Sequence, residues 1–229
     1  MPRKNRIHLD GHIWHITQRC HQKEFLLDDP SDRRHWRRWL GEATRRHGLE
    51  VLDYVATSNH VHLLAADQGA GEIAPSMQLV SGCTAQRYNR REERRGAFWD
   101  GRYHATAVDS DTYLARCIVY IDTNMVRARV VDDPTRWEIS GIHELLTPDC
   151  ADPISNLDLL TRLLGIATID ELRDVRRQWL EEQIPGRDPI WTESVAVGSE
   201  RYLERVKADL GIRGRYLTTR MDAGRYVLA

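Results

Sequence analysis

The chain has 229 residues, of which 41% are hydrophobic and 29% charged, and its formal net charge at pH 7 is -1. This composition is typical of a folded globular protein and excludes a chain that is disordered throughout. No stretch reaches the roughly 18 consecutive apolar residues of a transmembrane helix, and the basic N-terminus lacks the apolar run of a signal peptide.

The charge is unevenly spread along the chain. Residues 1–130 hold 20 Lys and Arg against 16 Asp and Glu, whereas residues 131–229 hold 13 against 18. Almost all the cations are arginine, whose planar guanidinium suits phosphate oxygens and stacks on bases. The four cysteines, Cys20, Cys83, Cys117 and Cys150, form no Cys-x-x-Cys pair, which favours reduced thiols in a cytoplasm over a zinc site or disulfides.

The first part of the chain alternates strand-like and helix-like patterns. The β-branched, alternating run 12–19 predicts a strand, and Ser31 is the N-cap expected for a helix over 32–46 that Gly48 ends. Residues 49–56 predict a second strand, and the next strand follows so closely that the two should pair as a hairpin. We therefore expect an antiparallel sheet with a helix packed on one side.

The strand that starts near His60 carries two histidines separated by one residue. Because side chains alternate along a strand, His60 and His62 should emerge on one face about 6.8 Å apart at their Cα atoms, while Val61 and Leu63 face a core. Two such imidazoles can bind one divalent metal ion. The alternative is a pair of partly buried, hydrogen-bonded histidines without chemistry.

A helix predicted over 74–91 ends in an arginine-rich segment that aromatic residues follow. Basic side chains interleaved with rings suit single-stranded DNA, whose bases stack on the rings. The alternative is a solvated helix end with an aromatic ring in the core, and both interpretations stay open here. The candidate contacts to a nucleic-acid backbone or its bases are Arg87, Arg90, Arg91, Arg94, Arg95, Trp99, Arg102, Tyr103 and, farther along the chain, Arg127.

The next segment combines a strand, predicted over 102–108, with a helix over 112–129. Asp109, Ser110 and Asp111 offer N-cap residues for this helix. One stripe of the helix is apolar. A second, polar stripe carries Tyr120 and Asn124, which lie four residues apart and therefore on one face of the helix.

Beyond residue 150 the pattern becomes helical, with helices predicted over 156–165, 169–183 and 199–211 and a loop over 184–189. No metal or catalytic spacing occurs there. We therefore expect a catalytic domain over 1–148 and a helical C-terminal extension over 149–229.

Taken together, a His-Val-His strand and, about sixty residues later, a helix with Tyr-x-x-x-Asn resemble the single-tyrosine HUH transposases of the IS200-like superfamily, above all the REP-associated tyrosine transposases. The likeness covers residues 1–140. The matching residues are Pro2, Arg3, Arg6, Ile7, Gly11, residues 59–64, 101–103 and 108–111, Tyr113, Leu114, residues 120–124 and residues 126–128.

This resemblance implies an α+β fold, with a ferredoxin-like antiparallel sheet flanked by helices and a C-terminal all-helical extension. It implies a metal-dependent enzyme that cuts and joins single-stranded DNA near REP-type hairpins. Tyr120 is then the nucleophile, and His60 and His62 are ligands of Mg²⁺ or Mn²⁺. Asn124 stands where insertion-sequence relatives often have Gln as a third ligand. Met125 replaces a family proline, which should let the helix continue without a kink.

The implied chemistry is physically consistent, because a phenol with a pKa of about 10 attacks poorly unless a cation stabilises the phenolate. Two alternatives are kept: a catalytically silent, domesticated protein that binds DNA hairpins, and a metal-dependent hydrolase of a small molecule. The hydrolase would need further His, Asp or Glu ligands, and the sequence contains no second cluster. The resemblance also implies a bacterial cytoplasmic protein at the nucleoid, either a monomer or a homodimer.

Overall fold

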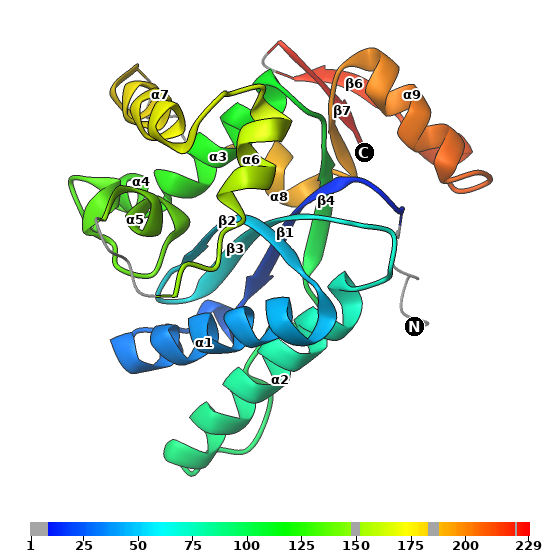
Figure 1. Cartoon of the computed structure of the whole chain (residues 1–229). Helices are drawn as coiled ribbons and strands as arrows, with labels where there is room; N and C mark the ends of the chain where they lie inside the picture. Colours follow the sequence, from blue (N-terminus) through cyan, green and yellow to red (C-terminus); the bar gives the residue numbers. More distant parts are fainter. Residues whose placement is uncertain (1–8, 148–151, 183–187, 223) are drawn as a thin grey trace.

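The computed structural model describes residues 9–147, 152–182, 188–222 and 224–229. Its first part runs β-α-β-β-α-β (Figure 1). Each helix connects two strands that have one other strand between them in the sheet. The elements are β1 (Ile13–Arg19), α1 (Pro30–His47), β2 (Glu50–Ala56), β3 (His60–Ala66), α2 (Ile73–Arg91) and β4 (His104–Val108), with a 3-10 turn, η1 (His21–Lys23), after β1.

Within the described residues one seven-stranded sheet has the order β2-β3-β1-β4-β5-β7-β6. Its last three strands are β5 (Ala196–Gly198), β7 (Arg225–Leu228) and β6 (Thr219–Asp222). The pairs β2·β3, β3·β1 and β1·β4 are antiparallel. Two β-α-β crossovers that each enclose one antiparallel strand give the ferredoxin-like arrangement. The predicted hairpin of β2 and β3 and the predicted α+β fold are confirmed.

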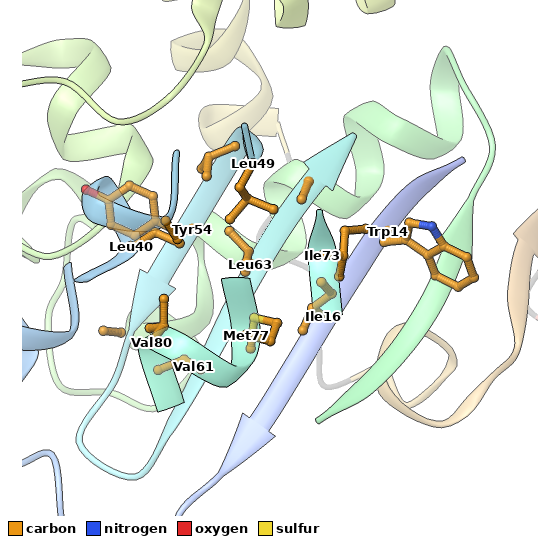
Figure 2. Packing of buried hydrophobic residues seen from close by; sticks show 14 of the residues in the cluster. Trp14, Ile16, Leu40, Leu49, Tyr54, Val61, Leu63, Ile73, Met77 and Val80 are labelled. Carbon is orange, nitrogen blue, oxygen red and sulfur yellow. The ribbon is translucent and has the colours of Figure 1, made fainter. Parts of the chain in front are cut away.

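The two faces of the sheet are covered by different helices. Helices α1 and α2 lie on one face, where Val61 and Leu63 of β3 pack against Leu40, Met77 and Val80 (Figure 2). On the other face Leu64 belongs to a second cluster, with residues of α3 (Thr112–Asp122), α6 (Leu157–Leu164) and α8 (Ile190–Glu193). The alternation along β3 therefore sends Val61 and Leu63 to the face of α1 and α2, and His60 and His62 to the α3 face, as predicted.

Helix α1 begins two residues earlier than expected, at Pro30 instead of residue 32. The side chain of Asp29, and not that of Ser31, caps the helix by accepting a hydrogen bond from the Ser31 backbone N–H at 2.7 Å. Pro30 at the first helical position has no N–H to satisfy and its φ is already helical, which places the cap at Asp29. Gly48, at φ 70°, ends the helix as predicted.

The helix that carries Tyr120 is interrupted, and the expectation of one continuous helix over 112–129 is wrong. Helix α3 (Thr112–Asp122) ends before Thr123, and a short α4 (Asn124–Arg127) follows. The Thr123 hydroxyl donates to the Val119 carbonyl at 2.6 Å, a back-bond that bends helices. Replacing proline by Met125 has thus not made the helix continuous.

The C-terminal part contains the expected helices together with strands that were not predicted. Strand β5 pairs in parallel with β4, and β7 and β6 extend the sheet beyond it. The helical extension is confirmed, but its description as all-helical needs this correction. The elements are α5 (Gly141–Leu146), α6 (Leu157–Leu164), α7 (Ile169–Glu182), α8 (Ile190–Glu193), β5 (Ala196–Gly198), α9 (Glu200–Asp209), β6 (Thr219–Asp222) and β7 (Arg225–Leu228), with 3-10 turns η2 (Pro134–Arg136) and η3 (Gly214–Tyr216).

Some predictions fall on residues outside those described: the motif residues at positions 2–7, Cys150, most of the 184–189 loop and the domain boundary at 148. Among the described cysteines, Cys20, Cys83 and Cys117 are free thiols. No helix in the described ranges combines the length and apolar character that crossing a membrane requires.

Candidate active site

Pairing of β1 with β3 assembles a polar surface on the α3 face of the sheet. Thr17 lies opposite His62 and Arg19 lies opposite His60. Directly opposed residues of antiparallel strands share a face. The rings of His60 and His62 lie on it with their centroids 4.9 Å apart.

The helical segment above this face brings Tyr120 and Asn124 to the histidines. The Tyr120 ring meets the His62 ring edge to face, with centroids 5.7 Å apart. The Asn124 side-chain amide nitrogen lies 3.0 Å from His62 Nε2. The structure thus brings together the four side chains that the resemblance singled out, from β3, α3 and α4.

Hydrogen bonds fix which nitrogen of His60 carries the proton. His60 Nδ1 lies 2.7 Å from Asn59 Oδ1 and 2.9 Å from the Thr57 hydroxyl. Asn59 uses its amide nitrogen to donate to the Lys23 carbonyl, so its oxygen is left to accept from His60. His60 Nδ1 is therefore the donor, and the Nε2 lone pair is available to a metal ion.

Burial keeps both histidines neutral. It lowers the pKa of His60 to about 4, and the nearby charges of Arg19 and Arg127 act in the same direction. Burial also holds the pKa of His62 well below its usual value, with the neighbouring His60 and His15 adding to the effect. A neutral imidazole is the form that binds a metal ion.

The environment of Tyr120 keeps its phenol protonated at rest. Burial raises the pKa of Tyr120, and the positive charge of Arg127 opposes that shift. The guanidinium carbon of Arg127 lies 4.2 Å from the Tyr120 ring centroid. A phenolate formed during a reaction would therefore have one cation beside it already.

The donor set fits a divalent ion that shares its coordination sphere with substrate. Two imidazoles and one side-chain amide are present, and no group of three or more His, Cys, Asp or Glu that could hold a metal occurs among the described residues. Three neutral ligands leave coordination positions for phosphate oxygens and water, as Mg²⁺ and Mn²⁺ prefer.

The predicted DNA contacts at the end of α2 fall into two groups: arginines that bind other groups of the protein, and arginines that are exposed without an ion pair among the described residues. Arg87 donates to the Ser31 carbonyl, Arg91 pairs with Asp32, and Arg94 lies 3.6 Å from Glu24.

Arg90 and Arg95, by contrast, are exposed, and none of the ion pairs within the described ranges involves them. Trp99 is only 8% exposed and donates to the Ser81 carbonyl, so its ring packs in the core. Arg102 is exposed and Tyr103 is half-buried.

Sequence reasoning missed three groups at this site. Arg19 and His15 lie in β1, each two residues from Thr17 and therefore on the same face of the strand. The third group is the backbone carbonyl of Trp191, in α8. The alternation of β1 could have indicated Arg19 and His15 once the β1·β3 register was known. Nothing in the sequence indicates a carbonyl about 175 residues away along the chain.

Comparison with known proteins gave the following matches. A family profile described as "Transposase IS200 like" matches residues 9–124. A solved structure of a REP-associated tyrosine transposase bound to a REP hairpin is 16% identical to this chain, with a TM-score of 0.53. The match covers 68% of this chain and 90% of the chain in that structure.

A crystal structure of a transposase candidate from Deinococcus radiodurans is 18% identical, with a TM-score of 0.37, and covers 47% of this chain and 86% of its own. No curated protein matches the chain. At 16% identity, the structure of the REP-associated tyrosine transposase supports the fold alone.

Proposed function

This chain belongs to the IS200-like transposase family, and from that membership we propose that it is a metal-dependent single-stranded DNA endonuclease and strand transferase. It acts near REP-type hairpins and forms a 5′-phosphotyrosine on Tyr120. The observation that carries the proposal is the convergence of Tyr120, His60, His62 and Asn124 on one face of the sheet.

His60, His62 and Asn124 are the residues that would hold a divalent ion. When bound, Mg²⁺ or Mn²⁺ supplies a Lewis acid for a non-bridging phosphate oxygen. The protein contributes two imidazoles kept neutral by burial, with the Nε2 lone pair of His60 left available by the bond to Asn59. Asn124 would have to present its amide oxygen, which needs only a rotation of its side-chain amide.

In the proposed step the Tyr120 oxygen bonds to the scissile phosphorus, and the bond from phosphorus to the 3′ oxygen breaks. The phenol loses its proton and the departing oxygen gains one, so the products are a 5′-phosphotyrosine and a free 3′-hydroxyl. One phosphodiester replaces another, so a second 3′-hydroxyl can reverse the step and join strands without ATP.

Two arginines flank the proposed phosphate position. Arg127 lies over the Tyr120 ring, and Arg19 stands opposite His60 in the β1·β3 register. A guanidinium can contact two phosphate oxygens at once, which suits the transferred group. Arg90 and Arg95, at the end of α2 and beyond it, are the exposed cations that we assign to the DNA backbone. The similar REP-associated transposase was solved with a REP hairpin, which supports a hairpin as the substrate of this chain.

The test uses DNA hairpins with single-stranded flanks, incubated with the protein and Mg²⁺ or Mn²⁺. We expect a covalent protein–DNA complex on a denaturing gel, which disappears with EDTA and in Tyr120→Phe while hairpin binding is retained. Tyr113→Phe, on the same helix, is the matched control and should keep the adduct. An undiminished adduct in Tyr120→Phe would refute the assignment of the nucleophile. Hairpin binding without any adduct in the wild type would instead identify a silent DNA-binding protein.

A further inference from the structure

A chain of three groups from distant parts of the sequence ends at His62. The Trp191 backbone carbonyl, in α8, lies 2.8 Å from His15 Nδ1. His15 Nε2, in β1, lies 2.8 Å from His62 Nδ1 in β3. The imidazole planes of His15 and His62 are only 11° from parallel. His15 is 0% exposed and His62 is 1% exposed, so water does not replace either bond.

The direction of each hydrogen bond follows from what the groups can do. A carbonyl oxygen only accepts, so His15 Nδ1 must carry a proton. His15 is buried without a carboxylate partner among its hydrogen bonds and therefore carries one proton, which leaves Nε2 as an acceptor. The proton between the two rings consequently sits on His62 Nδ1. The lone pair of His62 is then on Nε2, the nitrogen that lies 3.0 Å from the Asn124 amide.

We propose that His15 is a positioning residue that holds His62 in the tautomer whose Nε2 lone pair faces the metal site, and that the C-terminal extension sets this tautomer through the Trp191 carbonyl. The inference rests on the proposed function, because it needs His62 as a ligand. It gives the extension a defined task at the site. Without the fixed proton on Nδ1, His62 would spend part of its time with Nε2 protonated and unable to bind a metal ion.

The two ligands are held by unlike means. Local residues orient His60, since Asn59 and Thr57 are its immediate neighbours in the chain. The orientation of His62 depends on tertiary structure, because Trp191 and His15 reach it from α8 and β1. Such outer partners commonly change metal affinity by about 10- to 100-fold when they are lost.

Two substitutions at His15 separate its two contacts. The terminal amide of Gln reaches the position of imidazole Nε2. With its oxygen at that position, His15→Gln can accept the hydrogen bond from His62 Nδ1–H. The amide of Asn falls near Nδ1, so His15→Asn keeps the bond to the Trp191 carbonyl but does not reach His62. Each variant buries one side-chain amide, and the two amides are of similar polarity. We therefore expect the two variants to change the free energy of unfolding by similar amounts.

The measurement is Mn²⁺ affinity of the full chain without DNA, by electron paramagnetic resonance of the free ion. We expect His15→Gln to remain within about threefold of the wild type and His15→Asn to lose 10- to 100-fold. Equal Mn²⁺ affinity in all three chains would overturn the inference and leave the proposed function standing. Failure of the wild type itself to bind Mn²⁺ would overturn both.

A second measurement needs no folded variant at position 15. Long-range ¹H–¹⁵N correlation of the metal-free wild type reports which ring nitrogen of each histidine is protonated, with His62→Gln used to assign the His62 signals. We expect His62 Nδ1 to be protonated and Nε2 to be bare. A protonated Nε2 in His62 would contradict the proposal regardless of the affinities.

Discussion

At the scale of single residues, burial favours the neutral state of both the proposed metal ligands and the proposed nucleophile. Burial favours neutral histidines, which is the ligating state, but it also favours the neutral phenol of Tyr120. Burial therefore favours metal binding by the histidines but disfavours the phenolate of Tyr120. Arg127 lessens this conflict most, because its charge lies directly over the Tyr120 ring, and the charge of Arg19 acts in the same direction.

Arg127→Gln should slow cleavage much more than it weakens hairpin binding. Loss of one charge that stabilises a developing anion typically costs about 10²-fold in rate. The positive charge lowers the pKa of Tyr120, so its removal raises that pKa, and the rate should then rise with pH at a more alkaline position than in the wild type. Single-turnover adduct formation, measured across a pH series, gives both results.

Arg116→Gln is the matched control, since Arg116 is exposed on α3, the helix that carries Tyr120. It removes one positive charge from α3 without touching Tyr120, and its pH profile should coincide with that of the wild type. A profile for Arg127→Gln that does not move relative to Arg116→Gln would show that Arg127 does not act on the phenol.

Sequence reasoning named the four side chains that converge in the structure, but not how they are held. The spacing of His60 with His62, and of Tyr120 with Asn124, could be placed on a strand and a helix by periodicity alone. The tautomer of His62 could not be predicted, because it depends on the register of β1 against β3 and on a backbone carbonyl in α8. A carbonyl has no side-chain identity and leaves no sequence pattern.

At the scale of elements, the long periodic segments were predictable and the short ones were not. Helices α1 and α2 and strands β1 to β4 carry enough residues for a period to show. Strand β5 has only three residues, and α8 only four, so neither completes a recognisable pattern. These short elements are also the ones that bring the C-terminal part onto the sheet and place the Trp191 carbonyl.

A buried ion cluster attaches α7 to α3, the helix that carries Tyr120. Arg176 is 1% exposed, and its guanidinium contacts Asp122 of α3 at 2.6 Å and Asp53 of β2 at 3.2 Å. Asp122 lies two residues after Tyr120. Burial raises the pKa of both carboxyls, and the charge of Arg176 opposes that rise. The C-terminal extension thus supports α3 as well as the histidines.

Arg176→Met should lower the free energy of unfolding by about 3–5 kcal/mol, because it leaves two buried carboxylates without their cation. Urea denaturation monitored by circular dichroism measures this. Adding Asp122→Asn to Arg176→Met should recover part of the loss, since one uncompensated charge is then gone.

Arg177→Met is the control for this prediction, because the neighbouring Arg177 is 53% exposed and pairs with Asp174 on the surface. An exposed pair of this kind contributes at most about 1 kcal/mol. Equal losses in the Arg176 and Arg177 variants would mean that the buried cluster does not stabilise the fold.

At the scale of the whole molecule, the net charge of -1 hides a division that suits a DNA-binding enzyme. The excess of cations lies in the part of the chain that builds the site, and the excess of anions lies in the C-terminal part. Among the arginines at the end of α2, those paired with acidic or carbonyl groups stabilise the fold. The exposed Arg90 and Arg95 are the ones that we assign to phosphates of the DNA. The arginine-rich stretch therefore serves both interpretations that the sequence left open.

The combined Arg90→Gln and Arg95→Gln variant should bind hairpin DNA more weakly than the wild type, and with less dependence on salt. Each lost phosphate contact on a single strand should reduce the slope of log K against log salt by about 0.7, so the double variant should lose about 1.4. Titration of a fluorescent hairpin at several salt concentrations gives the slope. Arg45→Gln combined with Arg46→Gln, two arginines that pair with Glu42 on α1, removes the same charge elsewhere. Because a general change in net charge would act alike in both double variants, only a smaller slope in the Arg90 and Arg95 variant places the DNA backbone along the end of α2.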